Sequence, residues 1–269
     1  MTAIAESASL VIPGRSRLRW AVSDGLAVTW RNLLHYVRVP QLIFFSSIQP
    51  ILFVLLFRYV FGGAIQVPGL DYVNYMMPGI FAQTVVFGAA ATGVGLAEDI
   101  HRGVVNRFRA LPMARSAVLV GRTTADSVRN LLVVILMMAV GFLVGFRPTN
   151  GVLGVMAGIG LMMLFAYAVA WGMAVIGLNA PNGETAQVMI FPLLMPLTFA
   201  SSAFVPVESM PSWLRVFTEN QPVSKVIDAV RALMLGGPTA RPVLQALAWI
   251  VGLLAVLAPL AVWRYRRAT

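Results

Sequence analysis

Few residues of this chain could carry out acid–base chemistry. Glu98 and Asp99 stand beside His101 and Arg102, and two carboxylates together could act as a general acid and base. Adjacent helical residues do not share a face, however, and no second catalytic group accompanies them. A pairing with Arg102, or a cap on the following helix, is the better use of these acids. We therefore predict no catalytic residue.

Metal and nucleotide chemistry have equally little support. The only histidines, His35 and His101, lack ligand spacing around them, and the chain has no cysteine. A phosphate-binding loop needs a lysine after a glycine-rich turn, and the single lysine, Lys225, follows Ser224 in QPVSK. We expect this chain to bind no metal and no cofactor.

The composition predicts an all-α integral membrane protein. Hydrophobic residues make up 59% of the 269 residues and charged residues only 11%, too few to cover a soluble globule. The net charge of +10 is not a continuous patch, because the basic residues collect at the ends of apolar runs. A nucleic-acid partner is therefore not expected.

Six apolar stretches approach the roughly 20 residues that a membrane span requires. They cover residues 42–61, 76–97, 130–146, 152–178, 186–205 and 243–263. Basic residues concentrate before residue 41, in residues 98–129 and after residue 263, which places both termini in the cytoplasm of a multi-pass cell-membrane protein. Residues 1–41 then precede a six-span domain of residues 42–269.

Charge within the predicted spans is scarce. Acidic residues are missing from their interiors, which argues against an ion-coupled carrier. Arg58 is the one charge well inside a predicted span, near its outer end. Its side chain either reaches the interface or contacts a substrate or neighbouring subunit.

Two segments outside the spans have helical patterns. Residues 18–38 carry an apolar stripe that includes Leu26 and Trp30, which predicts an amphipathic helix at the membrane interface or against a soluble partner. In residues 206–240, Pro211 predicts the start of one short helix, and Gly236 with Gly237 the end of a second. These outer helices could re-enter the membrane, cap an exit or merely link two spans.

The fifth predicted span contains Pro192 and Pro196, which each remove a backbone hydrogen bond and should bend or break the helix. Thr198 and Ser201 could bond the freed carbonyls. The result is a hinge, a cavity lining or a static kink. Elsewhere, glycine pairs at residues 141 and 145 and at residues 154 and 158 permit close helix contact.

Residues 98–122 read EDIHRGVVNRFRALPMARSAVLVGR, a basic, proline-containing segment between two apolar stretches. Such a segment could receive force from a separate soluble ATPase. Alternatively, its arginines hold anionic lipid and fix the topology.

This segment, the block FPLLMPLTFASSAFVPVESMPSWLRVFTENQP from Phe191, and the six spans resemble the permease subunits of ABC-2 type ABC transporters, in particular daunorubicin-resistance-type drug exporters. The resemblance implies a permease dimer, of two identical or related copies, with two copies of a separate ATPase that binds ATP and Mg. It also implies a coupling helix seated on that ATPase, formed here by Glu98, Asp99, Arg102, Gly103, Arg107, Phe108, Arg109, Leu111 and Pro112.

The expected activity is export of an amphipathic molecule such as a drug, polyketide or lipid-like compound. We expect the substrate to contact the first, second and fifth spans, with the candidate residues Phe191, Pro192, Pro196, Thr198, Ser201 and Arg58. An ion-coupled secondary carrier and a membrane-embedded lipid-modifying enzyme are the alternative functions.

Overall fold

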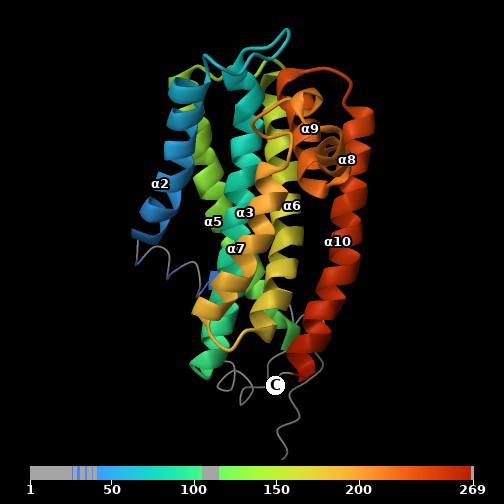
Figure 1. The fold of residues 1–269 in the computed structure, drawn as a ribbon. Helices are drawn as coiled ribbons and strands as arrows, with labels where there is room; N and C mark the ends of the chain where they lie inside the picture. The colour runs from blue at the N-terminus through green and yellow to red at the C-terminus, as the bar shows by residue number, and fades with distance from the viewer. Residues whose placement is uncertain are drawn as a thin grey trace, which may run out of the picture.

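The computed structural model describes residues 41–104 and 115–267 and the single positions 26, 29, 30, 34 and 38. Every regular element within these residues is a helix, as the composition predicts (Figure 1). The elements are α2 (Gln41–Leu55), the π-helix η1 (Leu56–Phe61), α3 (Tyr72–His101), α5 (Arg115–Val144), α6 (Gly151–Asn179), α7 (Gly183–Phe199), the short η2 (Val207–Ser209), α8 (Ser212–Asn220), α9 (Pro222–Leu235) and α10 (Ala240–Arg267).

Four of these helices are long and apolar enough to cross a membrane. They are Tyr72–His101, Leu119–Val144 within α5, Gly151–Asn179 and Ala240–Tyr265, each with at least 26 residues. At about 1.5 Å per residue, each exceeds the roughly 30 Å of a hydrocarbon core. The first and fifth predicted spans correspond to the shorter elements α2 with η1 and α7.

Helix α7 differs from the predicted fifth span in length and continuity. It has 17 residues and ends at Phe199, whereas the apolar pattern continues to residue 205. Pro192 and Pro196 do not break it, because the helix runs through both of them. Asn182 caps its start, where the side-chain oxygen accepts from the Thr185 amide at 2.8 Å.

Helix α5 corrects the sequence analysis at its amino-terminal end. We placed its start at Asn130, but the helix begins at Arg115 and carries two buried charged residues, Asp126 and Arg129. Arg58 is therefore not the only charge inside a membrane helix, and an acid does lie within one. The hydropathy pattern stopped at these residues because it does not register charges that have partners on a neighbouring helix.

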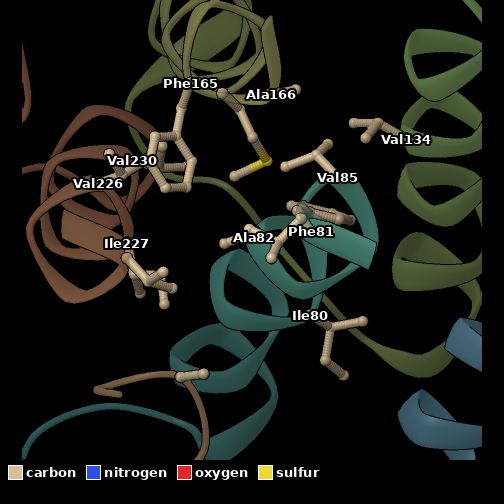
Figure 2. Close-up of a cluster of buried hydrophobic side chains, with 14 of the residues drawn as sticks. Ile80, Phe81, Ala82, Val85, Val134, Phe165, Ala166, Val226, Ile227 and Val230 are labelled. Atoms are coloured by element: carbon tan, nitrogen blue, oxygen red, sulfur yellow. The ribbon is translucent and has the colours of Figure 1, made fainter. Parts of the chain in front are cut away.

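Helix α3 occupies the middle of the bundle, with α2 and α5 on one side and α6, α9 and α10 on the other (Figure 1). Figure 2 shows how its side chains meet those of α5, α6 and α9. The buried cluster includes Ile80, Phe81, Ala82, Val85, Val134, Phe165, Ala166, Val226, Ile227 and Val230. The carboxyl ends of α3 and α10 lie at the same end of the bundle.

Two glycines let α3 and α6 approach each other closely. A methyl group on Gly177 would lie 2.2 Å from the Gly93 carbonyl oxygen, and one on Gly93 would lie 2.4 Å from the Met173 carbonyl oxygen. Only glycine fits at such a backbone contact. This pair is not among the glycine pairs that the sequence suggested.

One of the suggested pairs does serve close packing. A methyl group on Gly154 would lie 2.3 Å from the Leu233 carbonyl oxygen, and one on Gly158 would meet the Met234 side chain at 2.9 Å. The pair therefore brings the end of α9 against α6. In the other pair, a methyl group on Gly141 would lie 2.7 Å from the Met77 side chain of α3, whereas one on Gly145 would meet nothing within 4 Å.

Two short helices, α8 and α9, are present where Pro211 and the paired glycines predict them. Helix α9 begins with Pro222 and ends at Gly236, whose φ of 91° suits glycine. Its apolar face is buried against α3, α6 and α10. Figure 1 places both helices toward the end of the bundle opposite the carboxyl end of α10, where α9 packs on α6 and α10 and α8 packs on α9.

Arg231 attaches α9 to the rest of the bundle. Its Nη2 donates to the carbonyl oxygens of Ser202 at 2.8 Å and Tyr75 at 3.2 Å, and its Nη1 donates to Asp228 at 3.0 Å. The guanidinium carbon lies 3.9 Å from the centroid of the Tyr75 ring. A planar group with several donors is needed to make all these contacts at once.

We expect Arg231→Lys to lower the free energy of unfolding by about 1–3 kcal/mol, because an ammonium group cannot reach both carbonyl oxygens and leaves one of them without its donor. Thermal unfolding of the purified protein in detergent measures the change. Arg215→Lys is the matched control, since Arg215 pairs with Glu219 at 2.7 Å on exposed α8. Equal unfolding temperatures for Arg231→Lys and the wild type would contradict the assigned role.

Candidate functional site

The expected coupling segment begins where α3 ends. The Arg102 amide donates to the Glu98 carbonyl at 2.9 Å, and the Gly103 amide donates to the Ile100 carbonyl at 3.0 Å. Gly103 has a φ of 68°, which lets the chain leave the helix axis at little steric cost. The glycine therefore fixes the point within residues 98–122 at which α3 ends.

Glu98 takes one of the two roles expected of it, a pairing with Arg102. Its carboxylate accepts from Arg102 Nε at 2.6 Å, one helical turn away. It also accepts from the backbone amide of Gly183 at 3.4 Å. Because Gly183 is the first residue of α7, Glu98 connects the end of α3 to the start of α7.

Asp99 pairs across helices instead. It accepts from Arg122 of α5, and the two side chains are 26% and 19% exposed. One turn further along α5, Asp126 accepts from the Thr92 hydroxyl at 2.6 Å, and Arg122 Nε lies 3.9 Å from the Asp126 carboxylate. We call Thr92, Asp99, Arg122 and Asp126 the α3–α5 cluster. It holds together the two helices that flank the expected coupling segment.

The sequence analysis missed most of this cluster. Thr92 and Asp126 were not candidates, and Arg122 was only the last residue of a basic segment. The spacing of Arg122 and Asp126, four apart, indicates a shared helical face once both are placed on a helix. Their partners on α3 have no signal in the sequence.

Part of the expected coupling site lies outside the described residues. Glu98, Asp99, Arg102 and Gly103 are placed as above. The other predicted contact residues are Arg107, Phe108, Arg109, Leu111 and Pro112, and the structure does not describe them. Most of the predicted amino-terminal amphipathic helix also lies outside this part of the chain.

Three positions of the amino-terminal region are informative. Thr29 is buried and its hydroxyl donates to the Gly121 carbonyl of α5 at 3.2 Å. Leu26 and Trp30, on the predicted apolar stripe, are each 64% exposed. These two apolar side chains therefore face away from the described bundle, where lipid or a partner could cover them.

The predicted substrate residues do not form one cluster. Phe191, Pro192 and Pro196 are exposed on α7, and Arg58 is exposed on η1. Thr198 and Ser201 are each 1% exposed. They thus lie inside the protein, at the carboxyl end of α7.

The two buried hydroxyls bond local carbonyls that the prolines do not free. Thr198 donates to the Leu194 carbonyl, one turn earlier in the same helix. Ser201 donates to the Thr198 carbonyl at 2.5 Å and accepts from the Ala203 amide at 3.2 Å. These bonds shape the turn after α7.

Aromatic contacts connect α7 to its neighbours. The Phe191 ring packs edge-to-face on Phe87 of α3, with 5.7 Å between the centroids. Near the other end of α7, Phe57 of η1 stacks on Phe204 at 4.3 Å. Among the predicted substrate residues, Phe191 is thus the one whose ring packs on α3.

The family model "ABC-2 type transporter" matches residues 25–235. A daunorubicin resistance ABC transporter permease, DrrB1 of Streptomyces coeruleorubidus, is 35% identical over 246 residues, which cover 91% of this chain and 87% of that protein. A probable doxorubicin resistance ABC transporter permease, DrrC of Mycobacterium tuberculosis H37Rv, is 29% identical over 98% of this chain and 96% of that protein.

A more distant relative is a putative transport permease, ycf38 of Cyanophora paradoxa, which is 25% identical over 76% of this chain and 71% of that protein. The family model covers well over half of the chain, and the resemblance seen in the sequence is confirmed. The chain therefore belongs to the ABC-2 type transporter family, and its curated relatives include drug-resistance ABC transporter permeases.

Proposed function

We propose that this chain is the membrane-spanning subunit of an ATP-driven exporter and moves an amphipathic molecule across the cytoplasmic membrane. It works as a dimer of permeases with two copies of a separate ATPase, and the ATP and Mg are bound by that ATPase. The observation that carries the proposal is the α3–α5 cluster, which joins the helices on both sides of residues 105–114. The relatives named for daunorubicin and doxorubicin resistance support a drug-like substrate.

The proposed topology has six spans, with both termini in the cytoplasm. Helix α2 with η1 is the first span and α7 the fifth, beside the four long helices. The arginine-rich carboxyl end of α10 lies at the same end of the bundle as the carboxyl end of α3, in accord with the positive-inside rule (Figure 1). Helices α8 and α9 then enter the outer leaflet from the opposite side.

In the proposed mechanism, ATP binding closes the partner ATPase and displaces residues 98–122. Because Asp99 and Arg122 join α3 to α5, both helices move as one body. The bond from the Gly183 amide to Glu98 carries the displacement to the start of α7. A dimer interface open to the cytoplasm thereby converts to one open to the outside.

The test is the ATPase activity of the partner when it is copurified with this chain in lipid. We expect the double variant Arg107→Glu with Phe108→Ala to lose the partner or to lower the coupled ATPase rate at least tenfold. A charge reversal removes electrostatic complementarity, and truncation removes an apolar anchor of the kind that dominates binding energy.

The matched control is Arg241→Glu with Leu244→Ala, on the exposed surface at the start of α10. It makes the same kinds of change at the end of α10 far from the coupling segment, and should leave the coupled rate at the wild-type value. If no ATPase copurifies and transport instead follows an ion gradient, the chain is a secondary carrier and the proposal fails.

A further inference from the structure

The side-chain amide of a glutamine in the middle of α3 has no hydrogen-bond partner among the residues that the structure describes. Gln83 is 4% exposed, and both its amide oxygen and its amide nitrogen are buried without a partner. Nearly all buried polar side-chain atoms in proteins are bonded, so an unpaired amide requires an explanation. A ligand group that hydrogen-bonds to this amide would provide one.

Gln83 lines a half-open cavity of about 190 Å³ between α2, α3 and α5. The cavity is also lined by Arg129 and Asn130, which lie at the midpoint of α5. Gln83 lies near the midpoint of α3. Along α3 and α5, the cavity is therefore on the order of 20 Å from the helix ends. Lipid headgroups lie near the membrane surface, so a headgroup is a poor fit at this depth.

The polar side of the cavity offers several hydrogen-bond donors. The described lining contains six polar side chains: Ser46, Gln49, Gln83, Thr84, Arg129 and Asn130. Arg129 is 8% exposed, and its Nη2 donates to the Gly88 carbonyl at 2.6 Å and to the Asn130 side-chain oxygen at 3.2 Å. These bonds hold the guanidinium beside the cavity.

The charge of this lining selects between ligand classes. Arg129 is cationic, and the described lining has no acidic residue. A cationic ligand group would find no carboxylate partner in this lining, whereas a carbonyl or carboxylate oxygen can accept from the Gln83 amide beside the guanidinium.

The other side of the cavity is apolar and adjoins a second hollow. Phe53 and Phe87 line it. Gln49 and Phe53 also border a second, open hollow of about 610 Å³ along α2 and η1, whose other lining residues include Leu52, Leu56 and Val60. The cavity alone is too small for a drug-sized molecule, but together with the hollow it accommodates one.

We propose that this cavity binds the carbonyl or carboxylate end of an amphipathic molecule whose apolar part lies over Phe53 along α2 and η1. The third span, α5, thus takes part in ligand binding together with the first and second spans. The sequence analysis expected the fifth span beside those two. The inference rests on the proposed function in one respect, namely that the ligand is a transport substrate. Binding itself requires neither the ATPase nor transport, and is tested without them.

The experiment uses the full chain in phosphatidylcholine nanodiscs with a photoreactive palmitic acid and the amine of the same chain length. Laurate in excess serves as competitor, and labelled peptides are mapped by mass spectrometry. We expect laurate to compete with labelling by the acid on α2, α3 and α5, and the amine to give no such competed labelling. Competed labelling confined to other helices, or equal labelling by acid and amine, would overturn the proposal.

Gln83→Leu should reduce the competed labelling at least fivefold. It should leave the unfolding temperature unchanged or higher, because it removes an unpaired buried amide. Gln245→Leu on α10, outside the lining, is the matched control and should label as the wild type does. If folded Gln83→Leu is labelled as strongly as the wild type, the assignment of this cavity as the binding site is wrong. If laurate competes with the labelling but no ATPase activity is coupled to the chain, the binding site is supported and only the proposed exporter function is refuted.

Discussion

Replacing Gly177 with alanine should remove most of the folded protein. The added methyl group would lie 2.2 Å from the Gly93 carbonyl oxygen and 2.8 Å from its carbonyl carbon. Both are backbone atoms of a helix that the surrounding core holds, so no flexible side chain can move aside. Helices α3 and α6 would have to separate, and overpacking of this kind costs about 3 kcal/mol or more.

The measurement is the yield of monodisperse protein after extraction, together with the unfolding temperature of whatever remains. Gly160→Ala provides a matched control on the same helix, because a methyl group there would meet nothing within 4 Å. Alanine is the better helix former, so the control should be as stable as the wild type or more stable by up to about 1 kcal/mol. The same behaviour in the two variants would show that α3 and α6 do not meet as described.

The second large effect is expected at Arg122. Arg122→Gln should lower the free energy of unfolding by about 2 kcal/mol, since it leaves the part-buried Asp99 and the buried Asp126 without the arginine beside them. The coupled ATPase rate should fall at least tenfold in protein that is still folded, because the segment would then no longer move α3 and α5 together.

A double-mutant cycle separates this pairing from a general loss of charge. Asp99→Asn combined with Arg122→Gln should be more stable than Arg122→Gln alone, because one uncompensated carboxylate is gone. Arg215→Gln breaks the exposed pair with Glu219 and should change neither property. If the cycle shows no coupling between Asp99 and Arg122, the α3–α5 cluster has no mechanical role.

The sequence predicted well what depends on local chemistry. Apolar runs located the long helices, and Pro211 with Gly236 located α8 and α9, because proline and glycine restrict the backbone wherever they occur. Glu98 and Arg102 pair as their spacing suggests. Each of these features is determined within a few residues of chain.

The features that were not predicted correctly depend on contacts between residues far apart in the chain. Helix α5 extends through Asp126 because Thr92 of α3 donates to it. Gly93 and Gly177 matter only because α3 and α6 cross at that point. The same distinction applies to the candidate sites. Glu98 could be predicted from its sequence neighbours, whereas the importance of Arg122 and Gln83 depends on which helices pack beside them.

The bond between Thr92 and Asp126 also has a consequence for biogenesis. The two residues are 34 positions apart, so at about 5–20 residues per second a ribosome adds Asp126 about two to seven seconds after Thr92. The hydroxyl and the carboxylate can therefore satisfy each other as soon as both helices of the hairpin have been synthesised. The Gly93–Gly177 contact must wait for a further helix. Helices α3 and α5 thus form a pair that can leave the translocon together, with Asp126 already shielded from lipid before α6 arrives.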